Sequence, residues 1–143
     1  MTIKIVADSC CDIPPELAAQ LGITIVPLFI NIGQQSFKDG VTISREEFYR
    51  GLPSFPTHPT TATPGPDAFK QAYEQLAQQG ADGILSIHIS HKLSNTVDSA
   101  RIAAAETTSV PVTVLDSRQL SLGFGFVVMA AAEAAAQGKP MEE

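Results

Sequence analysis

Short β-rich runs alternate with helical segments along this sequence, and the alternation constrains the fold more than any other feature. Strands are expected at Ile3–Ala7, Ile23–Ile32, Gly83–Ile89 and Val112–Leu115. Helices are expected at Glu16–Leu21, Pro66–Gln79, Val97–Glu106 and, in an alanine-rich segment, Phe126–Gln137. Strands that alternate with helices form a mainly parallel sheet with helices on both faces, so we predict the α/β class.

The segment between the second strand and residue 66 is less regular. Pro27 interrupts the apolar run Ile23–Ile32, which predicts an edge strand or a bend. Ser36–Lys38 is expected to return as a small hairpin strand. Ser44 opens a capping box with Glu47, and the short helix behind it should reach about Arg50. Five of the ten prolines fall between residues 53 and 66, which indicates an ordered loop.

Composition and charge exclude several classes of function. The net charge is −6 and the basic residues are scattered, so nucleic-acid binding is disfavoured. No apolar run reaches the roughly 18 residues that a membrane span needs, and the start of the chain resembles a strand rather than a signal peptide. We therefore expect a cytoplasmic protein without a membrane span.

The cysteines and histidines give only weak signals. Cys10 and Cys11 are adjacent, which favours two small residues in a tight loop and leaves a redox role as the alternative. His88 is expected to be a packed core histidine, and His91 a solvated one. No metal-ligand spacing is present, so neither a metal nor a cofactor is expected. Motifs for dinucleotide binding, phosphate transfer and serine hydrolysis are missing too.

Hydroxyl-bearing segments lie where strands are expected to end, which is where α/β sheets bind ligands. Ser94 and Thr96 precede a helix whose free N–H groups attract anions, although Ser94 is also explained as a simple N-cap. The threonines between Pro59 and Pro66 form a stiff loop, or merely a turn before the next helix. Asp8-Ser9 and Asp116-Ser117 also follow strands, where an aspartate often only bonds loop amides.

Taken together and in order, these motifs resemble the bacterial DegV family. The early Asp-Ser of that family is matched by Asp8-Ser9, and its Ile-Val-Pro-Leu strand by Ile25-Val26-Pro27-Leu28. Its Thr-Ser-Gln-Pro-Ser loop aligns with Thr61-Ala62-Thr63-Pro64-Gly65, and its Ser-x-x-Leu-Ser-Gly-Thr segment with residues 90–96. Asp116-Ser117, Gly123 and Gly125 complete the match. The resemblance implies that residues 1–143 form the family's N-terminal α/β domain, with the second domain absent.

The resemblance also implies a function. Members of the family hold a long-chain fatty acid in an apolar tunnel and present its carboxylate to a fatty acid kinase, without being catalysts themselves. Carried over, the carboxylate meets Thr61 and Ser94. The resemblance places Ser9, Ala62, Asn95 and Thr96 around them as further site residues.

Several residues depart from the family pattern. Ala62, Thr63 and Gly65 replace Ser, Gln and Ser, which removes side-chain donors from the loop. Asn95 replaces a glycine, and Asn is the next best residue for left-handed backbone. Four apolar residues are candidates for the tunnel lining: Ile25, Phe29, Leu85 and Phe124.

Two other classes of function stay open at this point. One is a small hydrolase or phosphotransferase with Ser94 or Thr61 as nucleophile and His91 as base, although no orienting carboxylate lies at a known spacing. The other is a domain fragment or interaction module without activity of its own. The oligomeric state is undetermined.

Overall fold

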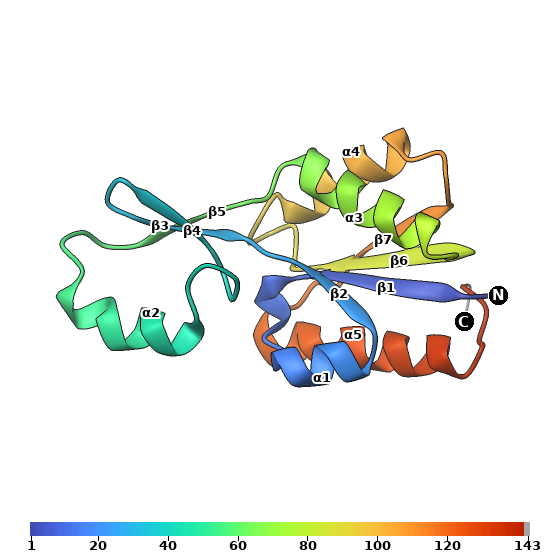
Figure 1. The fold of residues 1–143 in the computed structure, drawn as a ribbon, viewed down its shortest axis with the longest axis horizontal. Coiled ribbons are helices and arrows are strands. Elements are labelled where there is room, and N and C mark those ends of the chain that lie inside the picture. The colour runs from blue at the N-terminus through green and yellow to red at the C-terminus, as the bar shows by residue number, and fades with distance from the viewer. Residues whose placement is uncertain (142–143) are drawn as a thin grey trace.

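The computed structural model describes residues 1–141, and its centre is a four-stranded parallel sheet (Figure 1). The strands are β1 (Ile3–Asp8), β2 (Ile23–Val26), β6 (Gly83–His88) and β7 (Val112–Asp116), in the order β2-β1-β6-β7. Ile5 of β1 pairs with Ile23 on one side and with Leu85 on the other. The predicted α/β class with a mainly parallel sheet is confirmed.

Helices cover both faces of this sheet, as predicted. In Figure 1, α3 (Pro66–Gln78) and α4 (Thr96–Glu106) lie on one face, and α1 (Pro15–Gln20) and α5 (Ser121–Ala136) on the other. Side chains of β1 alternate between two cores. Val6 packs on the α3 side with Phe69 and Tyr73, whereas Ile5 and Ala7 pack on the α5 side. The apolar run Ile5–Ala7 of β1 follows from this burial on both faces.

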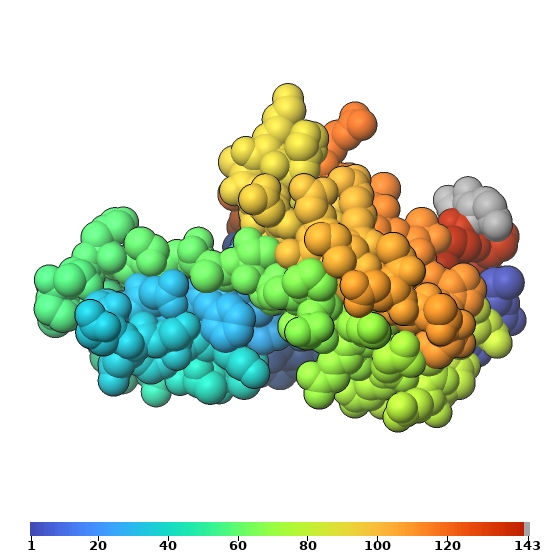
Figure 2. Space-filling view, turned by 90° about the horizontal axis from the view of Figure 1, so that it is seen from above, coloured from blue at the N-terminus to red at the C-terminus, as the bar shows by residue number. Residues whose placement is uncertain are grey.

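A smaller antiparallel sheet forms a lobe beside the main body (Figures 1 and 2). Its strands are β3 (Phe29–Ile32), β4 (Gln35–Lys38) and β5 (Thr60–Ala62), in the order β4-β3-β5. The helix α2 (Arg45–Gly51) and a 3-10 turn (Leu52–Ser54) complete the lobe. It has the predicted hairpin, but β5 lies inside the segment that we predicted to be a loop.

The bend predicted at Pro27 is confirmed and β2 is an edge strand of the parallel sheet, but the single strand expected over Ile23–Ile32 is in fact two strands. The run divides into β2, in the parallel sheet, and β3, in the antiparallel one, with Pro27 and Leu28 between them. A proline has no N–H to donate to a strand ladder, so the chain leaves the first sheet at this point. The bend carries the chain from the main body into the lobe.

The start of α2 agrees with its prediction from the sequence, whereas the start of α5 does not. The capping box is confirmed: Ser44 Oγ accepts from the Glu47 amide, and the Glu47 carboxylate accepts from the Ser44 amide. The helix α5 begins at Ser121 rather than at Phe126, so Gly125 lies inside it. A Cβ at Gly125 would overlap the carbonyl oxygen of Cys11, which means that this glycine allows close packing and does not break the helix.

Within residues 1–141, no helix has the length and apolarity to cross a bilayer.

Candidate functional site

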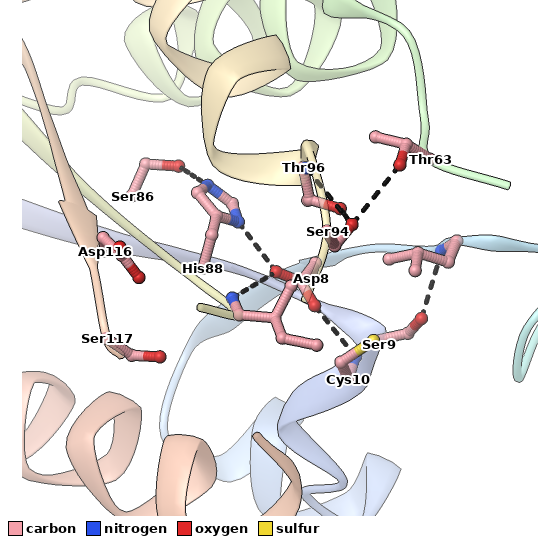
Figure 3. A network of polar contacts seen from close by, with 12 residues as sticks. Asp8, Ser9, Cys10, Thr63, Ser86, His88, Ser94, Thr96, Asp116 and Ser117 are labelled. Atoms are coloured by element: carbon pink, nitrogen blue, oxygen red, sulfur yellow. Dashed lines mark hydrogen bonds and ion pairs between the residues drawn. The ribbon is translucent and has the colours of Figure 1, made fainter. Parts of the chain in front are cut away.

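A fully buried hydrogen-bond network holds the carboxyl ends of β1 and β6 together (Figure 3). Asp8 Oδ1 accepts from the Cys10 amide at 3.0 Å, and Oδ2 accepts from the Ile89 amide at 3.0 Å. His88 Nδ1 lies 3.0 Å from Asp8 Oδ2, and His88 Nε2 lies 2.8 Å from Ser86 Oγ. Tyr73 of α3 donates its hydroxyl hydrogen to Ser86 at 2.8 Å. The network fixes the turn that carries Ser9.

The donors in this network have one consistent direction. Because Ser86 accepts from Tyr73, its own hydrogen points to His88 Nε2. His88 Nδ1 then carries the ring hydrogen and donates it to Asp8. The prediction that His88 is a packed core histidine is confirmed. Asp8 accepts hydrogen bonds from loop amides, which was the simpler of the two interpretations of an aspartate at a strand end. Burial raises the pKa of Tyr73 to about 12, against the lowering effect of its bond to Ser86.

A second cluster joins hydroxyl groups at the N-terminus of α4. Ser94 Oγ lies 2.7 Å from Thr96 Oγ1 and 3.4 Å from Thr63 Oγ1, and it accepts from the Thr96 amide at 3.3 Å. Ser94 is therefore a member of a three-hydroxyl cluster (Figure 3), and the N-cap of α4 is its neighbour Asn95 rather than Ser94. Thr63, which sequence reasoning set aside as a departure from the family pattern, supplies the contact from the preceding loop.

The other predicted site residues lie near these two networks in different ways. Thr61 is exposed on β5 opposite Ile30, and Ala62 is half-buried. Ser9 is buried, and its Oγ accepts from the Leu28 amide at 3.0 Å. Asn95 is exposed with a φ of −81°, so the expectation of left-handed backbone at this residue is wrong.

A cavity of about 300 Å³ lies between the lobe and the carboxyl edge of the parallel sheet. Ser9, Thr60, Thr61 and Ser121 bring hydroxyl groups to its wall. Its apolar lining comes from both parts of the molecule: Leu28, Ile30, Phe48, Tyr49, Pro59, Ile89 and Leu120. The structure thus places Ser9 and Thr61 on the wall of one cavity. Ser94 and Thr96 belong instead to the hydroxyl cluster, which Thr63 connects to the end of β5.

None of the four apolar residues that we expected to line a tunnel borders this cavity. Phe124 is fully buried in the core on the α5 side. Ile25 and Phe29 share one hollow, Ile25 also borders a second, and Leu85 borders a third. Side chains alternate along β3, so Ile30, on the opposite face from Phe29, lines the cavity.

Comparison with known proteins agrees with this arrangement. A family model described as "Uncharacterised protein, DegV family" matches residues 2–143. The chain belongs to the DegV family. A DegV domain-containing protein of Deinococcus radiodurans is 43% identical over 143 residues, which are all of this chain and 50% of the relative. The chain therefore spans about half the length of the curated relatives that it matches.

Two solved DegV structures are similar to this fold. A DegV family protein from Thermus thermophilus, described by its fatty acid binding, is 39% identical with a TM-score of 0.89. DegV from Bacillus subtilis, described as a fatty acid binding protein, is 29% identical with a TM-score of 0.94. Each match covers 99% of this chain and 50% of the other.

An exposed histidine, His91, forms a pair with Asp116 at this edge of the sheet. His91 Nδ1 and the His91 amide both bond Asp116, and the Arg118 amide bonds the same carboxylate. His91 is thus exposed but paired, and Asp116 is the carboxylate whose position the sequence did not reveal. The bonds of Ser94 go to Thr63 and Thr96 instead, so the described contacts contain no Ser94–His91 pair. Residues 1–141 also contain no group of three potential metal-binding side chains.

Proposed function

We propose that this DegV family chain binds a long-chain fatty acid and does not transform it. The observation that carries the proposal is an apolar cavity with hydroxyl groups on its wall, beside a hydroxyl cluster at the N-terminus of α4. The fatty acid binding described for the Thermus thermophilus and Bacillus subtilis proteins supports this chemistry. In the proposed complex the acyl chain occupies the cavity and the carboxylate faces Thr61 and Ser94.

The free-energy terms favour such a ligand. Burial of an acyl chain of about 16–18 carbons contributes on the order of 10 kcal/mol, at about 0.8 kcal/mol per methylene. A buried carboxylate without partners would cancel much of this gain. Hydroxyl groups and the first amides of α4 offset that cost through charge-assisted hydrogen bonds. Asp12 and Asp39 on the cavity wall share one cation, Arg45, and the remaining negative charge favours a carboxylate at the end of the cavity near Thr61.

Bound fatty acid and its dependence on Ser94 test the proposal. Native mass spectrometry of the purified protein should show a fatty acid of about 16–18 carbons, which buries enough methylenes to stay bound. Ser94→Ala should weaken binding about tenfold or more, because the headgroup loses a charge-assisted bond. Ser99→Ala is the matched control: Ser99 lies on the same helix, and its side chain takes part in none of the described side-chain hydrogen bonds. Unchanged binding in Ser94→Ala would remove Ser94 from the site.

The finer part of the proposal is a partner kinase that phosphorylates the bound carboxylate. Thr61 is exposed, so the proposed headgroup position is open to a second protein. With ATP, a fatty acid kinase and the loaded protein together, hydroxylamine should trap an acyl hydroxamate. The protein with ATP alone should give none. Trapping without the kinase, or turnover in an esterase or phosphatase screen, would favour the enzyme alternative.

A further inference from the structure

A second cavity adjoins the first and is separated from it by a wall of polar side chains. This second cavity has a volume of about 630 Å³ and lies between α1, the end of β2 and residues 39–46. Ser9, Asp12, Asp39 and Arg45 border both cavities. These four residues are the dividing wall.

Arg45 is the centre of the dividing wall. Its guanidinium forms an ion pair with Asp12 and lies 3.7 Å from Asp39. It also donates to the carbonyl oxygen of Ser9 at 2.8 Å. Arg45 belongs to α2 in the lobe, whereas Ser9 and Asp12 follow β1, so the side chain crosses the space between the lobe and the sheet.

The wall is anchored from the side of the main sheet. Ser121, the first residue of α5, donates to Asp12 Oδ2 at 2.6 Å. Asp12 and Ser121 have φ values of 54° and 51°, a left-handed backbone that non-glycine residues adopt only when their surroundings hold them. Burial lowers the pKa of Arg45, but the hydrogen bond and charge of Asp12, with Asp39, raise it overall. The wall is therefore a fixed, charged element.

We propose that Arg45 determines the acyl chain length that the protein accepts, by closing the first cavity against the second. This inference rests on the proposed fatty acid binding. An alkyl chain that passed the wall would have to displace Arg45 from Asp12, Asp39 and the carbonyl oxygen of Ser9, and it would meet charged groups there instead of an apolar lining. Loss of the Arg45 side chain joins the two cavities and admits longer chains.

The test loads the protein with an equimolar mixture of saturated fatty acids of graded length and identifies the bound species by native mass spectrometry. Arg45→Ala should shift the bound distribution toward longer chains by about two methylene groups or more, because the mutation opens unfilled volume. Arg45→Gln removes less volume and should shift it in the same direction by a smaller step. This milder variant also serves if Arg45→Ala does not fold.

Arg50→Ala is the matched control for this shift. Arg50 lies on the same helix α2 and is paired with Glu46 on the surface, and it borders neither cavity. Its distribution should equal that of the unmodified protein. If both Arg45 variants bind fatty acid with unchanged chain lengths, the inference is overturned and the proposed function stands. If the unmodified protein binds no fatty acid, the proposed function itself fails.

Discussion

Two aspartate–histidine pairs lie on either side of the carboxyl end of β6, and their surroundings give them opposite roles. Asp8 ends β1 and pairs with His88, and both side chains are 0% exposed. Asp116 ends β7 and pairs with His91, whose side chain is 54% exposed. Each aspartate also accepts backbone amides from the loop beside it. The same local chemistry therefore occurs once in the core and once at the surface.

The difference lies in the second ring nitrogen of each histidine. His88 Nε2 bonds Ser86, and its ring packs edge-on against Phe69 at 5.0 Å between centroids. The segments that carry His91 and Asp116, yellow and orange in Figure 2, project together from the body of the molecule. Water can replace a lost partner at the surface but not in the core, so we expect the two pairs to respond very differently to mutation.

The largest effect should follow from removal of the buried histidine. His88→Ala leaves Asp8 without the Nδ1 donor and Ser86 without its acceptor, in a region closed to solvent. Loss of one partner of a buried pair costs about 3 kcal/mol or more. Urea unfolding of the two proteins at neutral pH measures this difference in the free energy of unfolding.

A conservative variant separates lost packing from lost hydrogen bonding at residue 88. The side-chain amide of His88→Asn can donate to Asp8 from about the position of Nδ1, but it does not reach Ser86. It should therefore lose less stability than His88→Ala. Equal losses in the two variants would mean that ring packing on Phe69, not the bond to Asp8, carries the stability.

A smaller effect is expected at the far end of the buried network. Tyr73→Phe removes the hydroxyl that donates to Ser86, which should cost about 1 kcal/mol at neutral pH. The raised pKa of Tyr73 adds a pH dependence: its stabilisation is complete below pH 10, the usual tyrosine pKa, and is lost as pH rises toward about 12. The unfolding difference between the two proteins should therefore shrink over this range. A constant difference would show that Tyr73 ionises as easily in the folded protein as in the unfolded one.

The architecture was largely predictable from the sequence because it depends on local patterns. The apolar run of β1 and the helical spacing of Phe69, Tyr73 and Leu76 each follow from burial of the residues concerned. The antiparallel lobe was not predictable to the same degree, because β5 consists of three residues and forms only by pairing with β3, about thirty positions earlier. The start of α5 was predicted too late for a similar reason, since Cys11, against which Gly125 packs, is distant in the chain.

The candidate site was predictable in its location but not in its contacts. Strand ends pointed to Ser9 and Ser94, and both lie at this edge of the sheet. The contact of Ser94 with Thr63 and the dividing wall around Arg45 depend on how the lobe packs against the sheet. One local signal for Thr63 existed: in extended backbone it shares a face with Thr61, two residues earlier.

The smallest effect should come from the exposed pair. Burial raises the pKa of Asp116, but hydrogen bonds from the Arg118 amide and from His91 hold it below its ordinary value overall. Asp116 thus stabilises the fold above the pKa of an unfolded aspartate, and the contribution is lost as pH falls through the lower pKa of the folded state.

His91→Ala should therefore cost about 0.5 kcal/mol at neutral pH, as exposed pairs usually do, and nothing once Asp116 is protonated. His58→Ala, an exposed histidine outside these pairs, is the control. Urea unfolding at pH 7 and at a series of acidic pH values that extends below the lowered pKa of Asp116 measures both variants. A loss at His91 as large as that at His88 would show that solvent does not replace the lost partner, and the contrast between the two pairs would no longer hold.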